Sequence, residues 1–161
     1  MRLRAGAGGD VDAVIEAASP SRMKAVLDAW PTRLFLQGEP DSDWYDPDAG
    51  KERNLRYPGE GIEHVYLVAG GEVQGLLITS LPAVTRAPSE PLVAYIEYIA
   101  AAPWNRPSSG EAPRYRGVGK ALVQHAVARS ATEGREGCLG LNFLGDRAWA
   151  EGFMGGERSA P

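Results

Sequence analysis

Two glycines stand among three cationic side chains in a short stretch that could bind an anion. The stretch reads Arg114, Tyr115, Arg116, Gly117, Val118, Gly119 and Lys120. Glycine adopts positive φ and has no Cβ to hold a ligand away from the backbone. The apolar run over 92–100 predicts a strand before this stretch, and the periodic run over 118–133 predicts a helix after it. Because the first N–H groups of a helix lack internal partners and lie at its positive end, this arrangement predicts a phosphate site.

Two common phosphate motifs do not fit the stretch. A nucleoside-triphosphate loop needs Ser or Thr where the chain has Ala121, and a dinucleotide fingerprint needs Gly or Ala where it has Leu122. The pattern that fits is R-x-x-G-x-G, formed by Arg114, Gly117 and Gly119. This pattern resembles the pyrophosphate loop of the GCN5-related N-acetyltransferases, the GNAT family.

The resemblance extends along the chain. The matching segments, in chain order, are a first strand over 2–5, a first helix starting near Asp10, a hairpin over 62–81, a fourth strand over 92–100, a helix over 118–133 and a fifth strand over 138–144. The resemblance implies a GNAT-like α/β fold, an α+β protein with a mixed, largely antiparallel sheet that splays between its fourth and fifth strands. We expect a single domain over 1–161.

Three helical features follow from the residues themselves. Val11, Val14 and Ile15 share one face of a helix that Asp10 could cap. A second helix is expected from a cap at Ser21 to about residue 29, before the Trp-Pro pair at 30–31. In the helix after the glycine loop, a core stripe is expected, with Gly134 placed to end that helix. The stripe comprises Val118, Ala121, Leu122 and Ala126.

The resemblance implies acetyl-CoA as the acyl donor. The stretch over 114–120 would bind its pyrophosphate, and the backbone of Ile99, Ala100 and Ala101 would bind its pantetheine arm. The acceptor would be a small-molecule or peptide amine. An alkyl ammonium with a pKa near 10.4 is neutral only about once in 2,500 molecules at pH 7, so its acetylation needs a base. The motif leaves the identity of the acceptor open.

Glu97 is the candidate general base. Strand alternation places it on one face with Tyr95 and Ile99. A carboxylate in an apolar strand is costly to bury unless it is paired or lines a cleft. The structural alternative is an ion pair or a strand end at the solvent.

The resemblance weakens at the C-terminus. Family members carry a tyrosine there that protonates the leaving thiolate, whereas this chain has Met154 at the matching position. The family fold also continues through two more strands, whereas we expect 155–161 to be a flexible tail. A C-terminally short or degenerate member is therefore expected, and a non-catalytic acyl-CoA-binding or sensing module is the alternative function. An uncovered strand edge would favour a homodimer.

Other polar residues support weaker expectations. The segment over 37–61 is expected to be a long loop, and its acidic residues either receive a cationic amine or form a solvated acidic surface. These residues are Glu39, Asp41, Asp43, Asp46 and Asp48. The segment over 103–113 is expected to be a flexible insertion. His64 and His125 lack metal-ligand spacing, and Cys138 is expected to be a small buried side chain.

Composition limits the function classes. A formal net charge of −4 argues against nucleic-acid binding, for which a basic stripe is usual. The single cysteine fits a reducing compartment. No apolar run approaches the roughly 18–20 residues of a membrane span, and the N-terminal residues lack a signal peptide's apolar core. We therefore expect a soluble, cytoplasmic protein.

Overall fold

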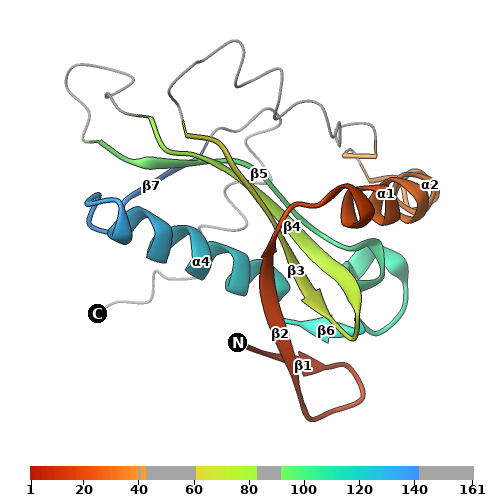
Figure 1. The fold of residues 1–161 in the computed structure, drawn as a ribbon. Coiled ribbons are helices and arrows are strands. Elements are labelled where there is room, and N and C mark those ends of the chain that lie inside the picture. Colours follow the sequence, from red (N-terminus) through yellow and green to blue (C-terminus); the bar gives the residue numbers. More distant parts are fainter. Residues whose placement is uncertain (40, 43–60, 83–91, 142–161) are drawn as a thin grey trace, which may run out of the picture.

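A single curved sheet of seven strands organises the chain in the computed structural model, which describes residues 1–39, 41–42, 61–82 and 92–141 (Figure 1). The strands are β1 (Arg2–Ala5), β2 (Asp10–Ala17), β3 (Glu63–Ala69), β4 (Glu72–Ser80), β5 (Ala94–Ala101), β6 (Tyr115–Arg116) and β7 (Leu139–Leu141). The helices are α1 (Pro20–Ala29), α2 (Pro31–Leu36) and α4 (Val118–Thr132), with two 3-10 helices, η1 (Pro103–Asn105) and η2 (Pro107–Ser109).

The sheet is mixed and largely antiparallel, as predicted. Its order is β6-β1-β2-β3-β4-β5-β7, and every neighbouring pair is antiparallel except the last. β5 and β7 run parallel and pair at Ala94–Leu139, Tyr95–Gly140 and Ile96–Leu141. Leu141 is the last residue that the structure describes, so the expected splay beyond this pairing lies outside the described residues.

The expected first helix is instead a strand. β2 pairs with β1 through a turn that contains Gly8 and Gly9, both at positive φ. Val11, Ala13 and Ile15 pack on the core that α4 covers, so the apolar period is two and not that of a helix. The i, i+3, i+4 spacing misled the prediction because Val14, which completes the helical pattern, is exposed at 51%.

The second predicted helix is confirmed with a different cap. α1 begins at Pro20, and the side chain of Ser19, rather than Ser21, accepts a hydrogen bond from the backbone N–H of Arg22. Pro20 occupies the first turn, where its missing N–H costs nothing. Trp30 ends α1, and Pro31 starts the short helix α2, which the sequence did not predict.

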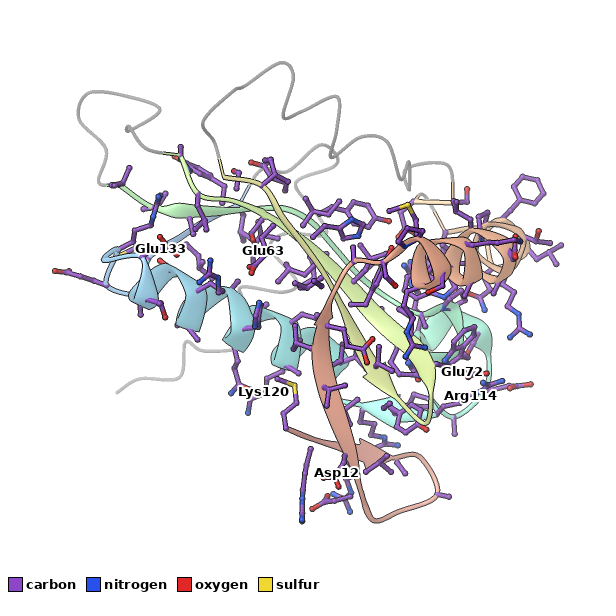
Figure 2. The ribbon with its side chains drawn as sticks, viewed as in Figure 1. Asp12, Glu63, Glu72, Arg114, Lys120 and Glu133 are labelled. Carbon is purple, nitrogen blue, oxygen red and sulfur yellow. The ribbon has the colours of Figure 1, made fainter. Side chains whose placement is uncertain are left out.

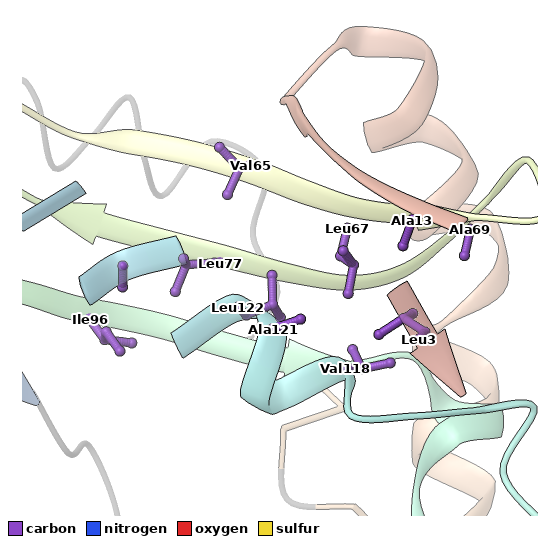
Figure 3. Close-up of a cluster of buried hydrophobic side chains, with 11 residues drawn as sticks. Leu3, Ala13, Val65, Leu67, Ala69, Leu77, Ile96, Val118, Ala121 and Leu122 are labelled. Carbon is purple, nitrogen blue, oxygen red and sulfur yellow. The ribbon is translucent and has the colours of Figure 1, made fainter. Parts of the chain in front are cut away.

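Helices cover both faces of the sheet. α4 lies on one face and packs on Leu67, Leu77 and Ile96 through the predicted stripe of small and apolar residues (Figure 3). α1 and α2 lie on the other face, where Trp30 and Leu34 contact the cluster that includes Tyr66 (Figure 1). Full burial of one such large apolar side chain contributes roughly 1.5–3 kcal/mol, so the two cores hold α4 and the central strands firmly in register.

Gly134 follows the end of α4 as predicted, whereas Cys138 is not buried as predicted. Gly134 adopts φ +73 directly after the C-cap Glu133, which satisfies the positive φ common at helix ends. Cys138 is exposed, contrary to expectation, because it belongs to the turn after Gly137 and β7 begins only at Leu139. None of the helices in the described part of the chain is long and apolar enough to cross a membrane.

Candidate functional site

The predicted phosphate loop lies at the N-terminus of α4. Gly117 is the N-cap and adopts φ +87, and no side chain of the described residues caps the helix. The N–H groups of Val118, Gly119 and Lys120 form the first turn and have no partner within the helix. These donors, together with the positive end of the helix dipole, can bind an anion.

The outer side of this turn is open. A Cβ atom added at Gly117 or Gly119 would meet nothing within 4 Å, so the backbone is accessible to a ligand at both glycines. Arg116 and Lys120 are exposed and form no ion pair with the described residues, and Figure 2 shows Lys120 projecting from the first turn of α4. Val118, in contrast, is 3% exposed and anchors the turn in the core.

Close packing on β4 fixes the position of the helix N-terminus. A Cβ atom at Gly75 would lie 2.6 Å from Cγ1 of Val118 and 3.0 Å from Cδ1 of Leu122. Only glycine therefore permits α4 to approach β4 this closely. Packing on β4 thus positions the first turn of α4. β4 pairs with β5, and the rest of the candidate site lies on β5.

Arg114, the first residue of the motif, contacts Glu72 and Trp104. Its Nη1 lies 3.2 Å from Oε2 of Glu72, and its guanidinium lies 4.9 Å from the centre of the Trp104 ring (Figure 2). Both charged side chains are at least half exposed, so the ion pair contributes little to stability. Arg116 and Lys120 are therefore the cations of the loop that a phosphate could neutralise without breaking an ion pair within the described part of the chain.

The last residues of β5 present part of their backbone at the edge away from β4. The N–H of Ala102 donates to the carbonyl of Gln74 on β4, and antiparallel pairing alternates along the strand. Ala100 therefore points its backbone groups to β4, while those of Ile99 and Ala101 point to the other edge. The carbonyl of Ala101 accepts a hydrogen bond of 2.9 Å from Nε of Arg106.

A β-bulge interrupts β5 at Glu97. Ile78 pairs with Tyr98 and Thr79 pairs with Ile96, which leaves Glu97 as the extra residue. Ile96 and Ile99 consequently pack on the same cluster, so the predicted alternation that put Tyr95, Glu97 and Ile99 on one face is wrong. A bulge was not predictable from the apolar pattern, because the pattern carries no gap or glycine at this point.

The carboxylate of Glu97 has a specific polar partner. The hydroxyl of Ser80, which is fully buried at the end of β4, donates a hydrogen bond to Oε1 of Glu97. Glu97 itself is half-buried. Burial of a carboxylate is tolerated when it accepts such a hydrogen bond. Ser80 was not predictable from the sequence, since a single serine near a strand end gives no signal.

Two residues of the predicted acidic loop belong to a partly buried network instead of a solvated surface. Asp41 accepts two hydrogen bonds of 2.7 Å from the guanidinium of Arg106, and Oε2 of Glu39 lies 3.2 Å from Nη1 of the same side chain. The exposed fractions of the Arg106, Glu39 and Asp41 side chains are 12%, 20% and 14%. These two carboxylates are thus neutralised within the chain. Asp43, Asp46 and Asp48 lie outside the described residues.

The network includes a tyrosine of β5. Burial, above all, and the nearby Asp41 carboxylate raise the pKa of Tyr98 well above its ordinary value, although Arg106 acts in the opposite direction. The hydroxyl of Tyr98 lies 3.5 Å from Oδ2 of Asp41. Tyr98 therefore stays neutral, and its hydroxyl remains a hydrogen-bond donor.

The segment over 103–113 is structured where it was expected to be flexible. It forms η1 and η2, and the hydroxyl of Ser108 donates to Glu39. Arg106 lies between the two turns, and no motif in the sequence indicates its role. Of the remaining expectations, Met154 and the tail over 155–161 lie outside the described residues, as does most of the long loop over 37–61.

The two histidines each lie beside a residue of β3. Nε2 of His125 lies 3.5 Å from Oε2 of Glu63, and the His125 side chain is 20% exposed. The ring of His64 packs against Tyr66 with a centroid distance of 4.9 Å. Across residues 1–39, 41–42, 61–82 and 92–141, no three His, Cys, Asp or Glu side chains gather closely enough to hold a metal ion.

The fold and the loop can be compared with known proteins. No protein-family model matches the chain, and neither does any curated protein. Among solved structures, the aminoglycoside N-acetyltransferase AAC(6')-Iy in complex with a CoA bisubstrate analogue aligns over 93% of this chain and 94% of its own, with a TM-score of 0.55 and 14% identity. A transcriptional regulator from Bacillus halodurans C-125 aligns over 93% and 95%, with a TM-score of 0.57 and 17% identity.

A third structure is a protein from Desulfovibrio desulfuricans that is assigned to the GNAT acetyltransferase family. It aligns over 89% of this chain and 80% of its own, with a TM-score of 0.53 and 15% identity. Identities this low show the fold alone. The chain therefore has the acyl-CoA N-acyltransferase fold of the GNAT proteins.

Proposed function

We propose that the chain is an acetyl-CoA-dependent N-acetyltransferase that acts on an amine. The observation that carries the proposal is the uncapped first turn of α4, where three N–H groups, two open glycines and two exposed cations converge. A singly charged group near a helix N-terminus contributes only about 0.3–1 kcal/mol, so a pyrophosphate needs several such donors at once. AAC(6')-Iy, which has the same fold, has been solved with CoA, and this supports the choice of ligand.

The rest of acetyl-CoA would extend from the loop along β5. The pyrophosphate of acetyl-CoA is bound by the backbone of 117–120 together with Arg116 and Lys120. Arg114 and Tyr115 position the chain that leads into this loop. The pantetheine amides pair with the edge of β5, where alternation favours Ile99 and Ala101 over Ala100. The thioester then lies near the bulge at Glu97.

In the reaction, the amine nitrogen attacks the thioester carbonyl carbon. A C–N bond forms, the C–S bond breaks, and CoA leaves as a thiolate. Glu97 accepts the proton that the ammonium must lose, directly or through a water molecule, and the second proton that the nitrogen loses as the amide forms passes to solvent. Such base catalysis contributes roughly 10²–10⁴-fold. The thiolate of CoA, with a thiol pKa of about 8.5 by analogy with cysteine, is a fair leaving group and takes up a proton from solvent if no acid assists.

A panel of small-molecule and peptide amines, assayed with acetyl-CoA, tests the proposal. Release of free CoA thiol together with an acetylated product identified by mass spectrometry supports an N-acetyltransferase. Micromolar CoA binding without turnover on any amine supports the second candidate, a non-catalytic acyl-CoA-binding module, for which Met154 in place of a tyrosine is the motivating observation. In that case, Met154→Tyr is the variant with which to seek restored turnover.

A further inference from the structure

A buried glutamine lies beneath the link that leads from β5 to the phosphate loop. Gln74 of β4 is 1% exposed, and both ends of its side-chain amide are bonded. Its Nε2 donates to the carbonyl of Ala69 at 3.1 Å. Its Oε1 accepts from Nε1 of Trp104 at 2.8 Å and from Nδ2 of Asn105 at 3.0 Å. A buried amide that is satisfied at both ends has a fixed orientation and can serve as an anchor.

Asn105 connects this anchor to the loop. Its Oδ1 accepts a hydrogen bond of 2.9 Å from the backbone N–H of Tyr115, ten residues along the chain. The Asn105 side chain therefore spans the distance between β4 and the first residue of β6. Tyr115 stands two residues before Gly117, so this contact fixes the chain immediately ahead of the N–H donors.

The contact matters because β6 is short and paired on one side. Its two residues pair with Arg4 and Ala5 of β1. On the opposite side, among the residues that the structure describes, the N–H of Tyr115 is satisfied by the Asn105 side chain rather than by a strand. Without Asn105, this N–H would lose its partner, and the loop would be held mainly from the β1 side.

We propose that Asn105 is a positioning residue for the phosphate loop, which it ties to the buried Gln74 so that the first N–H groups of α4 are preordered for a pyrophosphate. The proposal rests on the proposed function, since it assigns the ligand of the same loop. Asn105 does not itself contact the pyrophosphate. A loop that is ordered before binding loses less conformational entropy when the ligand arrives, so preorganisation increases affinity.

The test compares two variants that each remove a hydrogen bond to Gln74. Asn105→Ala removes the contacts to both Gln74 and Tyr115, whereas Trp104→Phe removes only the indole donor and keeps the aromatic ring beside Arg114. The dissociation constants for CoA and for pantetheine, which lacks the pyrophosphate, are measured for each variant, with thermal unfolding as the check on folding. The ratio of the two dissociation constants distinguishes a specific loss of pyrophosphate binding from a general loss of binding by a disturbed fold.

Asn105→Ala is expected to weaken CoA binding at least tenfold and to leave pantetheine binding within twofold, while Trp104→Phe leaves both within twofold. Equal losses for CoA and pantetheine, or no loss of CoA affinity, would overturn the proposal. If wild-type protein binds no CoA, the proposed function itself fails. If Asn105→Ala does not fold, amide hydrogen exchange of the wild-type protein decides, since rapid exchange at the Tyr115 N–H would contradict a loop ordered by Asn105.

Discussion

The hydroxyl of Ser80 donates a hydrogen bond to Oε1 of Glu97 across the bulge that separates two segments of β5. The bulge gives this carboxylate a position outside the regular ladder, and the buried Ser80 fixes one of its oxygens. Under the proposed function, this carboxylate is the group that takes a proton from the substrate amine. Bulges commonly re-aim a side chain next to a functional site.

Glu97→Gln is expected to lower turnover at least tenfold and to leave CoA affinity unchanged. Glutamine can still accept the Ser80 hydrogen bond through its amide oxygen, but it cannot act as a base. Steady-state kinetics on an amine that the wild-type enzyme acetylates, with calorimetry for CoA, provide both readouts. Ser80→Ala is the matched control and should reduce turnover less, because it removes the orienting bond but keeps the carboxylate. Full activity in Glu97→Gln would exclude the base role.

Arg106→Met is expected to destabilise the fold by about 3 kcal/mol, because it leaves the partly buried carboxylates of Asp41 and Glu39 without their cationic partner. Denaturant unfolding measures the loss. In the double variant Arg106→Met, Asp41→Asn, part of that stability should return, since one uncompensated charge is gone. Additive losses in the two single variants and the double variant would show that the pair is not coupled.

The free energy of unfolding should fall as the pH is lowered, because His64 is protonated more readily in the unfolded chain. Burial lowers the pKa of His64 below its ordinary value of 6.5. Above pH 6.5 the side chain is neutral in both states, but as the pH falls below 6.5 the unfolded chain takes up a proton that the folded chain resists. Unfolding free energies at pH 7 and pH 5.5 should therefore differ less in His64→Gln than in the wild type. An identical pH dependence in the two proteins would contradict this account.

The sequence predicts the parts of the molecule whose signal is local. The hairpin of β3 and β4 follows from two apolar runs joined at Gly70 and Gly71, and the helix α4 follows from its stripe and from Gly134. Gly117 and Gly119, at the start of this helix, indicate the candidate phosphate loop. The helix predicted from Asp10 fails because Val11 and Ile15 fit helical and strand spacing equally well, and only pairing with β1 decides between them.

Contacts between distant segments could not be predicted. Arg106 is 65 residues from Asp41, Asn105 meets Gln74 31 residues away, and Ser80 meets Glu97 across a register shift. None of these pairs has a spacing rule, because their geometry depends on how the strands stack and where the bulge falls. The same applies to Gly75, whose role is apparent only from the α4 side chains packed against it.

Calorimetric titration with acetyl-CoA tests the central claim most directly. The wild-type protein is compared with the double variant Arg116→Glu, Gly119→Asp, which places two carboxylates at the uncapped helix N-terminus, and with Lys24→Glu, which reverses one exposed charge on α1. Micromolar binding by the wild type and by Lys24→Glu, lost in the double variant, is the predicted result. A well-folded wild type that does not bind, or a double variant that binds as tightly, would contradict the assignment of the loop as a CoA site.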